Sequence, residues 1–274
     1  MHKRMFASER IPQLVRLESG GLDLDCAEPI QIVTRPQKLV AVTEPCSVAA
    51  EKFRNLAIRL RNFQKRQQLK TLLITSSIKG EGKSVVSANL AVTLAQGQRT
   101  LLVDCDLHQS GLRDVLGTSG QAGIAEWWRQ STSAISFVRR MQDVPLWYLP
   151  AGQGSEHPLE ILQSDRFSEL LNEFSTWFDW IVLDSPPLVP VADSAALAVH
   201  IDGTLLVVRQ ANTPKPLLKE ALKTENLKLL GIVANDWQGV EQSYYSQYYR
   251  GYISHRQIAS NDRPQLSTSL DPEF

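Results

Sequence analysis

The sequence predicts an α/β fold in which a mostly parallel β-sheet lies between two layers of helices. From residue 69 onward, apolar stretches of strand length alternate with stretches of helical periodicity, which is typical of parallel sheets with helical crossovers. Residues 101–103 and 181–183 are apolar at every position, as expected of strands covered on both faces. The first strand runs into a glycine-rich turn that opens a helix, and this is how α/β proteins build phosphate-binding loops.

The composition fits one large α/β domain with tails. The chain has 274 residues, of which 43% are hydrophobic, and its formal net charge is zero. A neutral chain has no overall attraction for nucleic acid, so we expect no nucleic-acid partner. Cys26, Cys46 and Cys105 are too few and too scattered for a disulfide framework or a zinc site. A reduced, cytoplasmic setting is therefore expected.

The periodicity divides the chain into three parts. Residues 1–47 lack a regular pattern and contain four prolines, which predicts an irregular lead-in with a short strand near residues 39–42. Residues 48–240 are expected to form the α/β domain. Residues 241–274 predict a flexible C-terminal tail that begins with a tyrosine-rich stretch.

The domain is expected to begin with a basic amphipathic helix over residues 48–66. Seven Lys or Arg residues and no acid lie between residues 52 and 70. Apolar residues recur at helical spacing on one face: Phe53, Leu56, Leu60 and Phe63. A helix of this kind can be a solvated charged face, a lipid-binding surface or a contact with another subunit.

Strands and helices then alternate along the domain. The predicted strands lie at residues 71–76, 100–104, 146–149, 180–184, 204–208 and 230–234. The predicted helices lie at residues 84–96, 158–175, 192–199 and 214–226. Together they predict the three-layer fold of phosphate-loop (P-loop) NTPases, with helices on both faces of the sheet.

The glycine-rich turn has the pattern of a Walker A phosphate loop. It reads Ser76-Ser77-Ile78-Lys79-Gly80-Glu81-Gly82-Lys83-Ser84. Its two glycines let backbone N–H groups point inward, where a β-carbon would block a phosphate. The helix start adds unpaired N–H groups and the positive end of the helix dipole. Serine replaces glycine at position 77, but the Gly-x-Gly-Lys-Ser core remains.

This loop predicts a site for ATP and Mg²⁺. We expect Lys83 to place its ammonium group at the β- and γ-phosphates and the Ser84 hydroxyl to ligate Mg²⁺. The same residues would suit a tight turn without a ligand, but the strand before them and the helix after them favour a nucleotide site. The loop residues expected to bind ATP are Ser77, Lys79, Gly80, Glu81, Gly82, Lys83, Ser84 and Val85.

Acidic residues end two of the predicted strands. Asp184 follows residues 180–183, and Asp104 and Asp106 follow residues 101–103. Because the carboxyl ends of parallel strands face the ligand crevice, we expect these carboxylates near the loop. Asp184 and Asp104 are candidate Mg²⁺ ligands, and Asp104 or Asp106 could align or deprotonate an acceptor hydroxyl. A lone aspartate after a strand is usually a turn residue or a helix cap, whereas two acidic strand ends beside a phosphate loop favour catalysis.

The start of the tail is rich in tyrosine. Five of the six tyrosines in the chain are Tyr244, Tyr245, Tyr248, Tyr249 and Tyr252. They could form an aromatic stacking surface, or they could be phosphate acceptors on a mobile segment. Phosphorylation would add about −1.5 to −2 charges at each tyrosine, so that several modified tyrosines would repel one another.

These motifs resemble the bacterial tyrosine kinases of capsule and exopolysaccharide assembly over residues 43–252. The family's Walker A-prime motif is matched by residues 101–107 and its Walker B motif by residues 178–187. The resemblance implies γ-phosphate transfer from ATP to tyrosine, mostly between neighbouring subunits. It also implies subunit contacts through Glu51 and Arg54, and Asn235 lies where related ATPases place an adenine-contacting asparagine.

The chain departs from this family in three places. Lys79 stands where proline is common, and His108-Gln109-Ser110 stands where the family has an arginine-containing stretch. Ala57 replaces the last arginine of the subunit-contact motif Glu-x-x-Arg-x-x-Arg. The second difference predicts a lower turnover, and the third predicts weaker ring assembly.

The resulting hypothesis is an ATP-dependent tyrosine autokinase that regulates polysaccharide polymerisation and export. The resemblance implies a membrane-embedded co-polymerase or chain-length determinant as partner, self-association, a cognate tyrosine phosphatase, and a cytoplasmic location at the inner face of the membrane. One alternative is a partition- or positioning-type ATPase, although Ile78 stands where those proteins usually carry a lysine. The other is a nucleotide-binding scaffold without catalysis.

Overall fold

The computed structural model describes residues 27–30, 38–130, 132–155, 157–210 and 212–236. Within them, the strands form one eight-stranded sheet in the order β1-β4-β5-β3-β6-β2-β7-β8. Every neighbouring pair is parallel except β4 and β5. The strands are β1 (Glu28–Ile30), β2 (Thr71–Ser76), β3 (Thr100–Asp104), β4 (Arg139–Met141), β5 (Leu146–Leu149), β6 (Trp180–Asp184), β7 (Gly203–Arg209) and β8 (Leu229–Asn235). The mostly parallel sheet confirms the predicted fold class.

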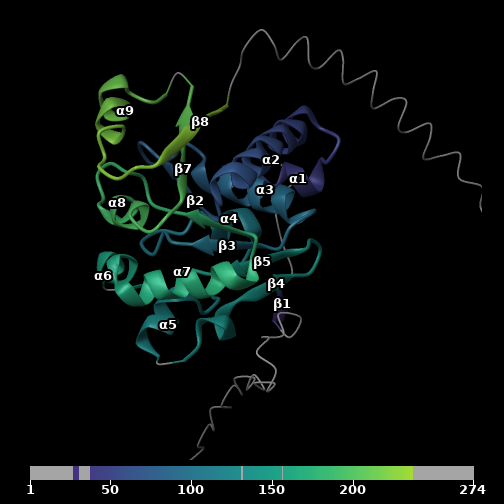
Figure 1. The fold of residues 1–274 in the computed structure, drawn as a ribbon, viewed down its shortest axis with the longest axis vertical. Coiled ribbons are helices and arrows are strands. Elements are labelled where there is room, and N and C mark those ends of the chain that lie inside the picture. The colour runs from purple at the N-terminus through teal and green to yellow at the C-terminus, as the bar shows by residue number, and fades with distance from the viewer. Residues whose placement is uncertain (1–26, 31–37, 131, 156, 211, 237–274) are drawn as a thin grey trace, which may run out of the picture.

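Helices cover both faces of this sheet (Figure 1). The α-helices are α1 (Val40–Thr43), α2 (Val48–Gln67), α3 (Lys83–Ala95), α4 (Leu112–Leu116), α5 (Ile124–Arg129), α6 (Pro158–Gln163), α7 (Asp165–Trp177), α8 (Asp193–Ala198) and α9 (Lys215–Ala221), and a 3₁₀ turn, η2, spans Ala134–Phe137. Helices α1 to α4 pack in one hydrophobic cluster, whereas α5 to α8 and η2 pack in a second.

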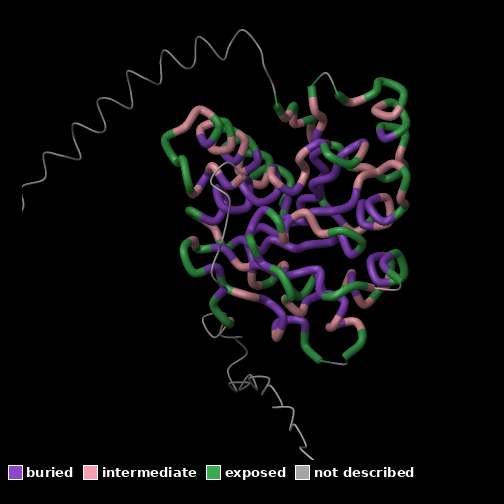
Figure 2. Tube along the Cα trace, turned by 180° about the vertical axis from the view of Figure 1, so that it is seen from behind, coloured by how far each residue is buried: buried purple, intermediate pink, exposed green. Residues whose placement is uncertain are grey.

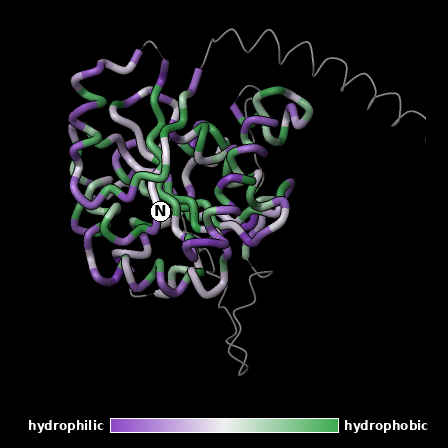
Figure 3. The backbone as a smooth tube through the Cα atoms, turned by 45° about the horizontal axis from the view of Figure 1, so that its top comes forward, coloured by the Kyte–Doolittle hydropathy of each residue, from purple (hydrophilic) through white to green (hydrophobic). Residues whose placement is uncertain are grey.

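The two clusters explain why the central strands are apolar at successive positions. Along β2, Leu72 and Ile74 belong to the first cluster and Leu73 to the second, and all three are fully buried. The strands therefore lie at the centre of the buried region in Figure 2 and of the hydrophobic region in Figure 3. Packing of both faces fixes the carboxyl edge of the sheet, where the site lies.

Six strands lie where the sequence predicts them, with ends that differ by at most one residue. The sequence did not reveal β1 and β4, which have three residues each. The interpretation of residues 1–47 as irregular is corrected where residues are described, because β1 and α1 lie there.

The short strand expected near residues 39–42 is wrong, because these residues form the turn of helix α1. The Ala41 N–H donates to the Oδ1 of Asn89, a buried residue of α3, at 2.9 Å. The Asn89 amide also donates to the carbonyl oxygen of Lys38 at 2.8 Å. These two bonds favour a helical turn over the extended form that Val40 and Val42 prefer locally.

Two predicted helices differ in extent. The helix expected over 158–175 is two helices, because Ser164 is extended with ψ 148° and its side chain accepts a hydrogen bond from Phe167 N–H at the start of α7. The helix expected over 214–226 ends at Ala221. The basic helix is confirmed as α2, which Ser47 caps by accepting from the Ala50 N–H.

Candidate active site

The phosphate loop joins the end of β2 to the start of α3, as predicted. Gly80 and Gly82 have φ of 91° and 88°, in the left-handed region that side chains rarely adopt. A β-carbon on Gly82 would lie 2.1 Å from Nδ2 of Asn235, whereas one on Gly80 would meet open space. Gly80 is exposed, and its left-handed φ gives the loop the curl that a phosphate-binding turn needs.

Glu81 stabilises the loop from inside the protein. Its Oε2 accepts from the Ile78 N–H at 2.9 Å, and its Oε1 accepts from the Thr213 hydroxyl in the segment after β7. The side chain is buried. Asn235, at the end of β8, donates to the Glu81 carbonyl oxygen at 3.0 Å. The side chains of both residues hold the loop in shape, and their predicted contacts with ATP stay predictions.

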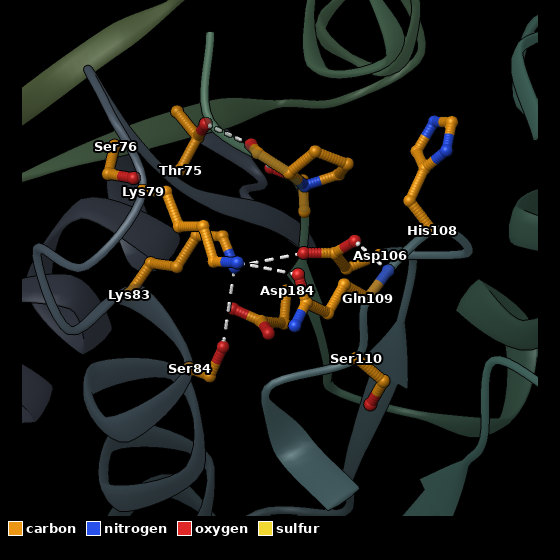
Figure 4. Close-up of polar contacts among 12 residues, drawn as sticks. Thr75, Ser76, Lys79, Lys83, Ser84, Asp106, His108, Gln109, Ser110 and Asp184 are labelled. Carbon is orange, nitrogen blue, oxygen red and sulfur yellow. Dashed lines mark hydrogen bonds and ion pairs between the residues drawn. The ribbon is translucent and has the colours of Figure 1, made fainter. Parts of the chain in front are cut away.

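Lys83 lies at the centre of an acidic cluster (Figure 4). Its ammonium contacts Oδ2 of Asp106 at 3.1 Å and lies 3.5 Å from the Ser84 hydroxyl. Asp104 and Asp184 end β3 and β6 and pair directly in register. The parallel sheet thus brings together the lysine and the three aspartates that the motifs singled out.

Hydrogen bonds hold two of these aspartates in place. Asp104 accepts from the Ser110 hydroxyl and, at 3.3 Å, from the buried Tyr148 hydroxyl. Asp184 Oδ1 accepts from the Ser87 hydroxyl at 2.8 Å, while its Oδ2 is buried without a hydrogen-bond partner. An unpaired buried carboxylate oxygen is costly unless another group binds it, so Asp184 is equipped for a cation.

The crowding of negative charge changes the protonation of these groups. Burial, followed by the carboxylate of Asp184, raises the pKa of Asp104 to about 7. Burial also raises the pKa of Asp184, although the positive charge of Lys83 opposes this shift. Burial alone would lower the pKa of Lys83, but the three surrounding carboxylates outweigh it and raise the pKa. Lys83 therefore stays charged.

The residues present fit a magnesium nucleotide. Ser84 and Asp184 supply a hydroxyl and an unpaired carboxylate oxygen beside the phosphate loop. Among the described residues, no three His, Cys, Asp or Glu side chains are arranged to enclose a metal ion. Mg²⁺ usually takes only one or two protein carboxylates, with phosphate and water as its other ligands. The Ser84 hydroxyl and the Asp184 carboxylate near Lys83 match this coordination preference of Mg²⁺.

The segment that follows Asp106 makes contacts that sequence reasoning missed. His108 Nε2 lies 2.6 Å from Asp193 Oδ2, and Gln109 Oε1 accepts from Lys79 Nζ at 2.6 Å. Ser110 donates to Asp104, as described above. Lys79 thus bridges from the loop to the 108–110 segment. The only signal in the sequence was the departure of this segment from the family pattern.

The other predicted residues are placed as follows. Ser77 is buried, and its hydroxyl has no hydrogen-bond partner. Val85 lies in the first turn of α3. On α2, Arg54 pairs with Glu51 at 2.5 Å and donates to the Pro45 carbonyl oxygen. The candidate phosphate acceptors lie outside the described residues: Tyr244, Tyr245, Tyr248, Tyr249 and Tyr252.

Comparison with known proteins agrees with this geometry. Residues 72–258 match the model of the CobQ/CobB/MinD/ParA nucleotide binding domain. The chain is 32% identical over 216 residues to the tyrosine-protein kinase YwqD of Bacillus subtilis, covering 77% of this chain and 91% of that protein. It is also 32% identical over 249 residues to the succinoglycan biosynthesis transport protein ExoP of Rhizobium meliloti, covering 86% of this chain but only 31% of ExoP.

A solved structure shows the same fold. The crystal structure of the VpsO kinase domain superposes with a TM-score of 0.61 at 33% identity, covering 70% of this chain and all of that one. The likeness therefore extends from motifs to architecture. The chain belongs to the CobQ/CobB/MinD/ParA family of nucleotide-binding P-loop domains and, within it, to the bacterial tyrosine-protein kinases.

Proposed function

We propose that this chain is an ATP-dependent protein-tyrosine kinase that transfers the γ-phosphate to tail tyrosines of a neighbouring copy. The observation that carries the proposal is the meeting of Lys83, Asp104, Asp106 and Asp184 beside the phosphate loop. A kinase needs a cation for the transferring phosphate, carboxylates for the metal and a group that aligns the acceptor. Lys83, Asp184 and Asp106 support these three roles in turn.

Each side chain has a role in this proposal. Lys83 and the N–H groups of residues 77–84 bind the β- and γ-phosphates and orient them toward the aspartates. Ser84 and Asp184 hold Mg²⁺, with Asp104 as a further ligand in its ionised form. When bound, Mg²⁺ neutralises charge on the phosphate oxygens. Asn235 supports the wall of the nucleotide pocket through the Glu81 carbonyl oxygen.

Asp106 is the better candidate to align the tyrosine hydroxyl. Both oxygens of Asp104 already accept hydrogen bonds, from Ser110 and Tyr148 on one and from the Asp106 N–H on the other. Asp106 accepts from fewer donors: its Oδ2 accepts from Lys83 Nζ at 3.1 Å and its Oδ1 from the Gln109 N–H at 2.9 Å. Turning Asp106 toward an incoming hydroxyl therefore leaves two donors unpaired, one fewer than at Asp104.

The names of the relatives support a proposal for the setting of the activity. ExoP is named for succinoglycan transport, and we propose that this chain likewise regulates exopolysaccharide polymerisation and export. Its partners would be other copies of itself, a membrane-embedded co-polymerase and a cognate tyrosine phosphatase. In the described part of the chain, every helix is too short or too polar to span a membrane. We propose that the partner holds the kinase at the cytoplasmic face.

One assay tests the kinase proposal. The purified chain is incubated with Mg·ATP, and phosphate is located by mass spectrometry. We expect phosphotyrosine within residues 244–252, and we expect Lys83→Met to abolish it. Lys219→Met, at an exposed lysine of α9, is the matched control and should stay active. Phosphotyrosine that persists in Lys83→Met would contradict the proposal.

The same assay decides between the alternatives. The family description names MinD and ParA, which favours a switch ATPase as second candidate. Such a protein would consume ATP without phosphate on tyrosine. A scaffold would bind ATP and neither hydrolyse it nor modify itself.

A further inference from the structure

A second polar pair lies at the edge of the site, between His108 and Asp193. His108 follows Asp106 by two residues, and Asp193 opens α8 in the segment that leaves Asp184. Their side chains approach to 2.6 Å between Nε2 and Oδ2. The contact thus joins the two loops that follow the catalytic strands β3 and β6.

The two partners differ in exposure. The side chain of Asp193 is 5% exposed, whereas that of His108 is 49% exposed. A buried carboxylate needs a partner, and His108 donates its Nε2–H to it. With Nε2 so engaged, the imidazole is held in one orientation and its Nδ1 is left as an acceptor. Within the described residues Nδ1 makes no hydrogen bond.

The position of His108 is on the far side of Asp106 from Lys83 (Figure 4). Lys83 is the phosphate-binding group, and in-line transfer brings the acceptor from the side opposite the leaving nucleotide. The imidazole on that side is half-exposed. It therefore offers an oriented acceptor to a hydroxyl that approaches Asp106 from the side opposite Lys83.

We propose that His108 binds the acceptor tyrosine at the rim before its hydroxyl reaches Asp106, with Nδ1 accepting the phenolic hydrogen at that stage while Asp193 holds Nε2–H. Asp193 is a positioning residue in this arrangement. The proposal rests on the kinase function, and it assigns a substrate-binding residue to a segment in which this chain departs from its relatives. Only a hydrogen bond is formed, and no proton is transferred.

A double-mutant cycle on binding tests the proposal. The full chain, with Mg²⁺ and a non-hydrolysable ATP analogue, is titrated with a peptide of residues 241–254 that keeps one tyrosine and has phenylalanine at the other four positions. Each tyrosine is kept in turn. The reference peptide has phenylalanine at all five positions, so it differs from each one-tyrosine peptide by a single hydroxyl. We expect that hydroxyl to improve affinity about two- to tenfold for at least one position.

The protein arm of the cycle uses His108→Phe, which keeps an aromatic ring and loses both ring nitrogens. We expect the two peptides to bind this variant equally. His108→Gln retains an N–H for Asp193 and an oxygen that accepts, so part of the hydroxyl effect should return. His157→Phe, at an exposed histidine, should behave as the unmodified chain. A purely structural role for His108 would weaken both peptides alike.

Two results would overturn the inference. One is a hydroxyl effect of equal size in the unmodified chain and in His108→Phe, and the other is no hydroxyl effect in the unmodified chain. Failure of the kinase function looks different, because it appears as absence of phosphotyrosine in the mass spectrometric assay. If the hydroxyl effect depends on His108 but no phosphotyrosine forms, the kinase proposal fails and the tyrosine-binding site at His108 remains. If phosphotyrosine forms but the hydroxyl effect does not depend on His108, the kinase proposal remains and the tyrosine-binding site fails.

Discussion

Asp104 is a residue whose protonation depends strongly on its surroundings. It is fully buried beside Asp184, and its pKa is raised to about 7. Between about pH 4 and pH 7 the folded chain keeps a proton here that the unfolded chain has lost. The stability gained from this protonated group is complete below about pH 4 and is lost as the pH rises through 7.

Because Asp104 loses its stabilising contribution as the pH rises, Asp104→Asn, which mimics the protonated form, should not lose it. Relative to the unmodified chain, the free energy of unfolding of the variant should rise by about 2 kcal/mol between pH 5 and pH 8. Urea denaturation at both pH values measures it. Asp114→Asn, at an exposed aspartate of α4, should follow the unmodified chain. Parallel pH profiles of Asp104→Asn and the unmodified chain would contradict the assignment.

The meeting of Lys83 with Asp104, Asp106 and Asp184 could be predicted because each residue lies in a local motif. A lysine after two glycines, or an aspartate after an apolar strand, implies its place in a parallel sheet. The pairing of His108 with Asp193 could not be predicted, because 85 residues separate them. Nor could the inward turn of Glu81, since its partner Thr213 lies on another loop.

At the scale of elements, the junction of the phosphate loop and α3 depends on Gly82. Substitution by alanine would combine an unfavourable left-handed φ with a contact to Asn235. We expect Gly82→Ala to lower the free energy of unfolding by about 1–2 kcal/mol and to weaken ATP binding at least about tenfold, because the loop N–H groups move. Calorimetric titration with Mg·ATP measures the affinity.

Gly120→Ala is a control that separates the cost of a left-handed φ from the effect of changing the phosphate loop. Gly120 also has a positive φ of 76°, but an added β-carbon there would meet open space. It should carry a similar cost in stability and leave ATP affinity unchanged. Equal ATP affinities for Gly82→Ala and the unmodified chain would show that the loop does not bind the phosphates.

The contact between α1 and α3 gives a second prediction at this scale. Asn89 is fully buried and bonds with the backbone of Ala41 and Lys38. Asn89→Ala should lower the free energy of unfolding by about 1–3 kcal/mol, since these backbone groups lose their partner, and should speed hydrogen exchange at the Ala41 amide. Asn172→Ala, at an exposed site on α7, is the control. Unchanged exchange at Ala41 would contradict this role.

Strand prediction succeeded for strands whose burial on both faces requires apolar residues. It failed for strands that are extended only because they pair with a neighbouring strand. Strands β2, β3 and β6 are covered on both faces, so their apolar runs are unmistakable. Strands β1 and β4 have three residues each, and their extended form comes from pairing: β1, at the edge, pairs with β4, and β4 also pairs with β5. Helix α1 reads as a strand because Asn89, 48 residues from Ala41, is invisible to a local pattern.

For the whole molecule, the sequence predicts a sheet between two layers of helices, but it does not predict how copies of the chain associate. Ala57, at the third position of the subunit-contact motif, is fully buried, so that position offers no side chain to another copy. Glu51 and Arg54 pair within one chain. We propose that they still contribute to self-association. The double variant Glu51→Ala/Arg54→Ala should therefore sediment as smaller species, and an unchanged distribution would remove α2 from the interface.

Transfer between copies can be tested by mixing two inactive chains. Lys83→Met keeps the tail tyrosines, and a second variant has phenylalanine at all five positions but keeps its site. Neither should phosphorylate itself. With Mg·ATP, the mixture should place phosphate on the Lys83→Met tail, as mass spectrometry can show. Absence of modification in the mixture, with the unmodified chain active, would mean that each copy modifies only its own tail.

The Asn235 amide joins the end of the described fold to the phosphate loop through a hydrogen bond. Strand β8 ends there, one hydrogen bond from the carbonyl oxygen of Glu81 and in contact range of Gly82. The residues that follow Asp236 in the sequence include Tyr244 to Tyr252. In the proposed kinase, a pull on Asp236 from docking of the tail or from repulsion among its phosphates would load the Arg209–Asp236 ion pair and then, through Asn235, the phosphate loop, so that tail modification would weaken the loop's hold on ATP.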